Sequence, residues 1–237
     1  LARRCGDRGI EFMSTPSDED AADMLVALGM KRIKVPSGEI TNLPFLRHLA
    51  TKAVPMIIST GMADMGEIRT AVEVVAETWA GRAIALGEEG LTVLHCTSNY
   101  PAAFEDVNLR AMRTIADDIG LPVGYSDHTR GSAVSTAAVA LGACVIEKHF
   151  TIDTSLPGPD HGASLDPREL EALVSSIQAV EQCMGSARKG PTDSELPIRA
   201  LVRRSVTLQR DVALGEVVGR DDIALLRPGT GIPPRDL

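Results

Sequence analysis

The sequence predicts an α/β protein built as a (β/α)8 TIM barrel. Short apolar runs rich in β-branched residues alternate with longer segments of helical periodicity, and this alternation is typical of a parallel sheet covered by helices. Polar residues follow nearly every strand run. This favours a barrel, whose strand ends all contribute to one site, over a doubly wound sheet. A barrel needs eight strands and six are found, so the chain is predicted to lack the first two.

The predicted elements follow one another in alternation along the first 184 residues. Residues 1–5 resemble the end of a helix that leads into a strand, so we expect a chain that is cut at its start. Strands are predicted at residues 10–14, 32–36, 56–59, 92–96, 122–125 and 145–149. Helices are predicted between them at residues 17–28, 44–50, 65–78, 108–118 and 132–141, and an amphipathic helix follows at residues 165–184.

The composition changes after residue 184, which predicts a second domain. Residues 1–184 are interpreted as a partial barrel, and residues 185–200, rich in small, polar, Pro and Gly residues, as a linker. Residues 201–237 contain short strand runs at 205–208, 215–218 and 223–231 without helical periodicity. They are predicted to form a small, mostly β module that is itself cut short.

Composition limits the classes of partner. The net charge of -8 argues against nonspecific binding to nucleic acid or to an acidic membrane surface, and no stretch is apolar enough to span a bilayer. Small molecules or a second copy of the chain are therefore the expected partners. The four cysteines are widely spaced and form no CxxC pair, which favours reduced thiols and a cytoplasmic location.

Two histidines stand at the ends of consecutive predicted strands, His128 after residues 122–125 and His149 at the end of 145–149. If these strands are parallel neighbours, both imidazoles emerge at one edge of the sheet and can bind a divalent metal. A single histidine at a strand end is usually structural, but two at adjacent ends favour a site. Two imidazoles do not identify the metal, because they also suit zinc.

Seven phrases occur in the order and spacing of the sialic acid synthase family, which the chain resembles over nearly its whole length. They are Met13-Ser14-Thr15-Pro16, Lys34-Val35-Pro36-Ser37-Gly38-Glu39, Ile58-Ser59-Thr60-Gly61-Met62, Leu94-His95-Cys96-Thr97-Ser98-Asn99-Tyr100-Pro101, Gly124-Tyr125-Ser126-Asp127-His128, Glu147-Lys148-His149-Phe150-Thr151 and Pro157-Gly158-Pro159-Asp160. The tail from Arg203 to Gly231 is similar to the antifreeze-like (SAF) domain of that family.

The resemblance implies an enzyme that condenses phosphoenolpyruvate with an N-acylated aminosugar aldehyde, such as N-acetylmannosamine, into a nine-carbon sugar acid and releases phosphate. It implies that His128 and His149 bind manganese, with magnesium as a substitute. The positions that match phosphate and carboxylate contacts are Thr15, Lys34, Ser37, Ser59, Ser98 and Ser126. Those that match contacts to the sugar are Glu39, interpreted as catalytic, Tyr100 and Asp160.

Arg227 matches an arginine that the antifreeze-like domain of the family extends into the barrel site of the partner subunit. The resemblance therefore implies a domain-swapped homodimer. An arginine before Pro228 and Gly229 is otherwise a solvated turn residue. The other candidates also have structural alternatives: a surface lysine for Lys34, turn capping for each serine, a helix-start acid for Glu39, a turn residue for Asp160 and simple packing for Tyr100.

Two other functions stay open on the sequence alone: a metal-dependent aldolase on the same barrel, and a non-catalytic sugar-binding relative. An isolated polypeptide of this extent is expected to aggregate or to be inactive, because unpaired strand edges would be exposed. His95 is interpreted as structural, and so is His48, for which no acidic partner is expected nearby. His161 is left undecided.

Overall fold

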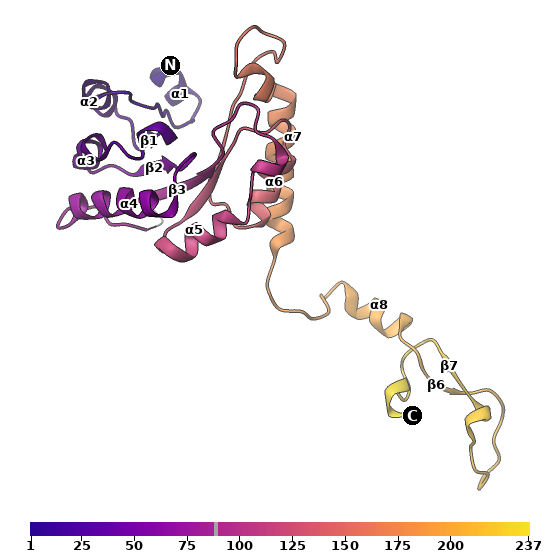
Figure 1. Ribbon diagram of the computed structural model, residues 1–237. Helices are drawn as coiled ribbons and strands as arrows, with labels where there is room; N and C mark the ends of the chain where they lie inside the picture. Colours follow the sequence, from indigo (N-terminus) through magenta and orange to yellow (C-terminus); the bar gives the residue numbers. More distant parts are fainter. Residues whose placement is uncertain (88–89) are drawn as a thin grey trace. The chain divides into compact units, whose positions relative to one another are not determined.

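The computed structural model describes residues 1–87 and 90–237, and the chain forms two compact units (Figure 1). The first unit is Leu1–Gly185 and the second is Ser186–Leu237. The division falls one residue beyond the predicted end of the barrel segment. Within the described residues no helix is long and apolar enough to cross a membrane.

The first unit is built on a curled sheet of five parallel strands (Figure 1). In spatial order, which is also chain order, they are β1 (Ile33–Val35), β2 (Met56–Ser59), β3 (Leu91–Cys96), β4 (Val123–Asp127) and β5 (Ile146–Lys148). Each neighbouring pair is parallel. Because all five strands run the same way, their carboxyl ends meet at one edge, as in half of a barrel.

Helices connect the strands and cover one side of the sheet (Figure 1). They are α1 (Ala2–Asp7), α2 (Glu19–Ala27), α3 (Leu43–Thr51), α4 (Met65–Trp79), α5 (Ala111–Ile119), α6 (Ala133–Ala140) and α7 (Pro167–Met184). Their starts follow from local chemistry: Asp64 and Asp166 each form a capping box at the start of a helix. Gly120 ends α5 at φ 65°, a conformation that costs little only for glycine.

The core lies between the sheet and these helices. Val35, Met56, Ile58, Leu91 and Val93 point to the helix side and are at most 1% exposed. Apolar burial of this kind contributes about 25 cal/mol per Å². Trp79 is 3% exposed, and its indole N–H donates to the carbonyl of Ala50 at 3.0 Å, which joins α4 to α3.

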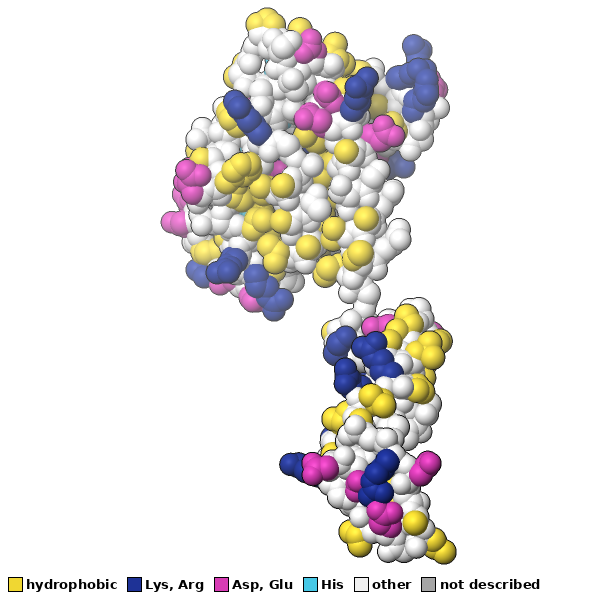
Figure 2. All heavy atoms as spheres, turned by 90° about the vertical axis from the view of Figure 1, so that its right-hand side faces the viewer, with side chains coloured by type: hydrophobic (Ala, Val, Ile, Leu, Met, Phe, Trp, Pro, Cys, Tyr) yellow, Lys and Arg dark blue, Asp and Glu magenta, His cyan; other side chains and the backbone are white. Residues whose placement is uncertain are grey.

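The α6 and α7 side of the first unit carries apolar side chains on its surface (Figure 2). Val174 in α7 is 46% exposed and Leu141, just after α6, is 56% exposed. Single exposed apolar residues are normal on protein surfaces, so this face by itself assigns no partner.

Two strand predictions are wrong. Residues 10–14 form no strand: Ile10 is 64% and Met13 40% exposed, so little apolar burial fixes this segment beside β1, and the sheet has five strands instead of six. Residues 215–218 form a turn and an irregular segment, with Val217 88% exposed. Both segments have the β-branched or apolar composition of a strand, but neither pairs with another strand within residues 1–87 and 90–237.

The second unit contains α8 (Glu195–Val202) and a two-stranded antiparallel sheet of β6 (Ser205–Leu208) and β7 (Ile223–Leu226). Helix α8 overlaps the segment 185–200 that is predicted as a linker, so the last six residues of that segment are helical. Glu195 accepts from the backbone N–H of Thr192 at 2.8 Å, which helps to start this helix. The antifreeze-like character of the unit remains a prediction.

Gly124→Ala is expected to lower the free energy of unfolding by about 1–3 kcal/mol, the usual range for overpacking. A Cβ at this position would lie 2.5 Å from the backbone oxygen of Val145 and 2.6 Å from Leu94 Cδ2, so the strands would have to separate. Chemical denaturation measures the change. Gly162→Ala, whose Cβ would meet nothing within 4 Å, is the matched control, and equal stability of both variants would contradict the prediction.

Candidate functional site

Polar side chains gather at the carboxyl edge of the sheet, on the side opposite the core. Side chains alternate between the two faces of a strand. The register pairs Cys96 with Ser126 and Ser126 with Glu147, so these three side chains share the inner face. Lys34 of β1 and Ser59 at the end of β2 share it as well, since Lys34 Nζ donates to Ser59 Oγ at 2.8 Å.

His128 and His149 lie side by side just beyond the ends of β4 and β5. Their ring centroids are 5.4 Å apart and their planes are inclined by 57°. The Nδ1 atom of His128 is 2.8 Å from the carbonyl oxygen of Thr97. Because a carbonyl oxygen only accepts, Nδ1 carries the proton and Nε2 keeps its lone pair for a ligand. Tyr100 packs against both rings, with centroids 4.1 Å from His128 and 5.4 Å from His149.

The two imidazoles differ in basicity. Burial lowers the pKa of His149, because the nearby carboxylate of Asp160 offsets only part of the cost of charging the ring. Burial also opposes the charging of His128, but its hydrogen bonds to Cys96 and Thr97 outweigh it and raise its pKa. For the Cys96 thiol, burial opposes ionisation and the contact with His128, 3.7 Å away, overcomes it, so the pKa of Cys96 is lowered.

Lys34 is a buried cation at the centre of this edge. Its side chain is 7% exposed, and Nζ lies 3.4 Å from Glu147 Oε1. The other carboxylate oxygen of Glu147 accepts from Ser126 Oγ at 2.5 Å. The alternative of a surface lysine is therefore wrong. An ammonium group with hydroxyl neighbours at a strand edge is suited to bind a small anion.

Three strand ends also bring serines together. Ser37 Oγ accepts from the backbone N–H of Gly61 at 2.9 Å and lies 3.7 Å from Cys96 Sγ. A Cβ on Gly61 would overlap Ser98 Oγ and would lie 2.9 Å from Ser37 Oγ. Gly61 is thus required by the close approach of the two hydroxyls, which places Ser37 and Ser98 next to each other.

Gly61→Ala is expected to weaken anion binding at this edge by about tenfold, because the added methyl group pushes Ser98 and Ser37 away from each other and a lost hydrogen bond to a charged group is worth ~1.5–3 kcal/mol. The dissociation constant of a small anion such as inorganic phosphate, measured by calorimetry, shows the effect. Gly38→Ala is the control, since its Cβ would meet nothing within 4 Å. Identical constants for the two variants would contradict this role of Gly61.

The remaining predicted residues are less closely joined to this group. Glu39 lies in a 3-10 turn (Ser37–Glu39), and its carboxylate accepts from Asn42 Nδ2 at 2.8 Å. Asp160 is exposed, with Oδ2 4.0 Å from His149 Nδ1. Thr15 is exposed in the segment that was predicted as a strand end. Arg227 follows β7 and belongs to the second unit.

The other three histidines each have a hydrogen-bond partner that is not a predicted site residue. His95 bonds to the carbonyl of Val107 at 2.7 Å on the helix side of the sheet, and burial lowers its pKa, as fits a structural residue. The expectation that His48 lacks an acidic partner is wrong: its Nε2 is 2.9 Å from Asp23 Oδ1, because α2 packs against α3. His161, left undecided, bonds to Thr151 Oγ1 at 2.7 Å.

Sequence reasoning missed Glu147 and Cys96 as members of the site. A signal for Glu147 was present: it stands two residues before His149, and residues two apart in a strand share a face. Cys96 stands two residues after the inward-facing Leu94, whose side chain approaches Gly124 on the inner face. Cys96 is 6% exposed and contacts Ser37 and His128, which the prediction of reduced thiols from cysteine spacing could not indicate.

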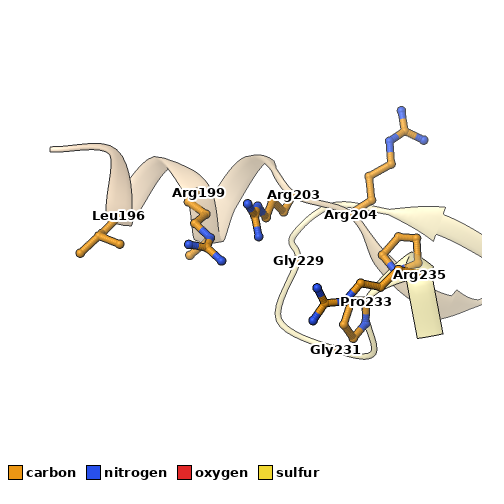
Figure 3. A pocket seen from close by; sticks show the side chains of 10 residues that line it. Leu196, Arg199, Arg203, Arg204, Gly229, Gly231, Pro233 and Arg235 are labelled. Atoms are coloured by element: carbon orange, nitrogen blue, oxygen red, sulfur yellow. The ribbon is translucent and has the colours of Figure 1, made fainter. Parts of the chain in front are cut away.

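The second unit contains a separate hollow of about 620 Å³ (Figure 3). Arg199, Arg203 and Arg235 lie around it beside the Gly229–Gly231 loop, whereas Arg204 points away and donates to the carbonyl of Leu225 at 2.8 Å. Arg227 is not among its lining residues, so this hollow contains none of the predicted site residues.

The donor set at the sheet edge would fit a divalent cation that takes its remaining ligands from outside the protein. No group of three or more His, Cys, Asp or Glu side chains in residues 1–87 and 90–237 is arranged to enclose a metal. His128 and His149 would supply two nitrogen ligands, which suit manganese, iron or zinc, and oxygen atoms of water or substrate would supply the others. Two protein ligands would leave coordination positions open, as catalytic metal sites do, whereas a closed structural site is fully enclosed by protein side chains.

A profile of the NeuB family matches residues 1–189. The N,N'-diacetyllegionaminic acid synthase of Legionella pneumophila is 56% identical over 237 residues, which are 100% of this chain and 65% of that protein. The enzyme of the same name from Campylobacter jejuni is 46% identical over 231 residues, 98% of this chain and 66% of that protein. This chain belongs to the NeuB family. The resemblance seen in the sequence motifs is thereby confirmed.

A solved structure agrees. The N-acetylneuraminic acid synthetase of Leptospira borgpetersenii, determined in complex with citrate, superposes with a TM-score of 0.75 at 34% identity, covering 83% of this chain and 66% of that one. The NeuB chain described here spans about two thirds of the length of the relatives it matches, 65% and 66% for the two synthases. The curled parallel sheet with its outer helices is the fold expected for part of a barrel.

Proposed function

We propose that this NeuB-family chain carries most of the strand-end face of a synthase that condenses phosphoenolpyruvate with an N-acylated aminosugar aldehyde and releases phosphate. One observation supports this most directly. A buried cation, Lys34, with serine hydroxyls around it shares the carboxyl edge of the sheet with the adjacent imidazoles of His128 and His149. An anion site and a metal-type donor pair at one edge serve the two substrates of such a condensation.

The anionic donor substrate would lie against Lys34. Phosphoenolpyruvate carries a phosphate and a carboxylate, and charge-assisted bonds to such groups are about twice as strong as neutral ones. Ser37, Ser59 and Ser98 would supply hydroxyl donors from three strand ends or the loops that follow them, and Ser126, whose hydroxyl donates to Glu147 here, would supply a fourth if it turned to the anion. Since Lys34 is already held by Ser59 and Glu147, little side-chain entropy is lost when it binds the anion.

The condensation forms a bond between the methylene carbon of phosphoenolpyruvate and the aldehyde carbon of the sugar. The aldehyde oxygen takes up a proton and becomes a hydroxyl group. Water then adds to C2 of the former enolpyruvyl group, and phosphate leaves from the resulting tetrahedral centre, which collapses to the ketone. Holding both substrates at one edge contributes much of the rate acceleration, because it replaces an encounter in solution.

Manganese, with magnesium as a substitute, is the proposed cation, and His128 and His149 would hold it. When bound, it would polarise the aldehyde carbonyl. The bond from His128 Nδ1 to Thr97 O keeps Nε2 unprotonated and directs the ring. Tyr100 contacts both rings, and with Asp160 it would line the pocket for the sugar. Glu39 is proposed to contact the sugar hydroxyls as a catalytic residue.

The proposed acceptor is a diacetamido-trideoxyhexose that yields a legionaminic-type acid. Two relatives, 56% and 46% identical, are named N,N'-diacetyllegionaminic acid synthase, whereas the structure named N-acetylneuraminic acid synthetase is 34% identical. We also propose that the enzyme is a cytoplasmic, domain-swapped homodimer in which an antifreeze-like domain brings Arg227 to the sugar in the partner's site. The tail motifs of the sequence support this part.

Release of inorganic phosphate tests the proposal. The protein at its full natural length is incubated with manganese, phosphoenolpyruvate and one of three aldoses: a diacetamido-trideoxyhexose, N-acetylmannosamine or its phosphate. Phosphate is expected only when both substrates are present, with the highest kcat/KM for the diacetamido sugar. A folded protein that binds manganese and releases no phosphate with any of these aldoses would disprove the proposed reaction.

A further inference from the structure

A buried ion pair lies directly behind the two histidines, on the helix side of the sheet. Lys148 Nζ is 3.1 Å from Asp127 Oδ2, and the two side chains are 4% and 0% exposed. The register pairs these two residues across β4 and β5, of which each is the last residue. The pair therefore joins the two strand ends at one fixed separation.

Each member of the pair directly precedes one of the histidines. Asp127 is followed by His128 and Lys148 by His149. Because successive side chains point to opposite faces, fixing Asp127 and Lys148 on the outer face fixes where the two imidazoles leave the inner face. The ring separation of 5.4 Å is thus coupled to the contact between Asp127 and Lys148.

Further hydrogen bonds hold the backbone on both sides of His128. Asp127 Oδ1 accepts from the backbone N–H and the hydroxyl of Thr129, both at 2.8 Å, and Oδ2 accepts from Ser135 Oγ of α6 at 2.5 Å. Lys148 Nζ also donates to the carbonyl of Thr129. His128 therefore stands between two residues that are both tied to this one network.

His149 depends on the network more than His128 does. The His128 ring has its own bond to the carbonyl of Thr97, whereas within the described chain the His149 ring makes no hydrogen bond and its nearest carboxylate, on Asp160, is 4.0 Å away. The backbone carbonyl of His149 accepts from Leu165 N at 2.9 Å. The strand end at Lys148 and the packing of Tyr100 are the further restraints on the position of its ring.

A buried ion pair of this kind is not explained by a gain in the free energy of unfolding. Removing two charges from water costs several kcal/mol per ion, and apolar residues of similar volume often stabilise a protein as well or better. An ion pair with four further hydrogen bonds instead holds the two strand ends in one defined geometry. A metal site needs such a geometry, because the groups behind the ligands must hold them close to their productive positions.

We infer that Asp127 and Lys148 are positioning residues that set the spacing of His128 and His149 for a shared divalent cation. The inference rests on the proposed function only for the cation. Asp127→Asn and Lys148→Met each leave one buried charge unpaired, so each single variant is expected to lose thermal stability and to bind manganese about 10- to 100-fold more weakly. The double variant Asp127→Asn/Lys148→Met has no unpaired charge and is expected to regain most of the melting temperature, but not the affinity for manganese.

Two measurements on the full-length protein decide the matter. Manganese titration followed by electron paramagnetic resonance gives the affinity, and crystal structures give the ring separation in the wild type and in the double variant. The control is Arg69→Met/Asp118→Asn, which removes an exposed ion pair of 2.7 Å and should change neither quantity. A double variant with wild-type affinity and an unchanged ring separation would show that the pair is only structural. A wild type that binds no manganese would end the metal assignment, and the ring separation would still decide the role of the pair.

Discussion

Replacing His128 or His149 by alanine is expected to reduce manganese-dependent phosphate release by roughly three orders of magnitude. Polarisation of a carbonyl by a bound cation is worth several kcal/mol, and each 1.36 kcal/mol corresponds to a factor of ten in rate. The two imidazoles, with centroids 5.4 Å apart, are the only histidine pair in ring contact within the described residues. Loss of either one halves the nitrogen ligation of the cation. Steady-state kinetics at several manganese concentrations measure the effect.

The matched control is His48→Asn, because His48 lies on α3, where it contacts Asp23 and Glu19 and no residue of the candidate site. This variant should keep wild-type turnover. Circular dichroism must show that the alanine variants remain folded, since His128 also contacts Thr97, Cys96 and Tyr100. Near-normal release by both alanine variants, still stimulated by manganese, would contradict the metal assignment.

The sequence predicted the parallel sheet because short apolar strand runs alternate with segments of helical periodicity. The strand at Met56–Ser59 was predicted to the residue, since it is buried along its whole length and bounded by loop residues. Residues 10–14 show where this reasoning fails. Their composition favours a strand, but a strand exists only where a neighbour supplies hydrogen bonds and burial, and no local pattern contains that information.

The candidate site was predictable where strand ends carried unusual residues. His128 and His149 were identified because each stands at the end of an apolar run, whereas Lys34 and Ser126 were identified through the resemblance to the family. Contacts between residues far apart in the sequence were harder to predict from the sequence. The pairing of Lys34 with Glu147 joins the first and last strands of the sheet, and that of His48 with Asp23 depends on the packing of α2 against α3. Such pairs depend on the tertiary arrangement and not on local periodicity.

Lys34→Met is expected to raise the Michaelis constant for phosphoenolpyruvate by about ten- to more than hundredfold, while that for the aminosugar changes little. Methionine retains the volume of the buried stem but removes the charge, and a charge-assisted contact is worth ~1.5–3 kcal/mol. Initial rates with each substrate varied in turn measure the two constants. Lys31→Met, at an exposed position, is the control. An unchanged constant for phosphoenolpyruvate would show that Lys34 does not bind it.

Removing the charge of Glu147 should affect the binding of phosphoenolpyruvate in the opposite direction to removing the charge of Lys34. Its Oε1 atom lies 3.4 Å from Lys34 Nζ, so the carboxylate neutralises part of the charge that the anion needs and repels the anion itself. Glu147→Gln retains an acceptor for Ser126 Oγ but removes the negative charge. Binding of phosphoenolpyruvate should therefore strengthen or stay unchanged in Glu147→Gln, although it weakens in Lys34→Met. If both variants weakened binding equally, the ion pair would be holding the sheet edge together and Lys34 would not be a direct ligand of the anion.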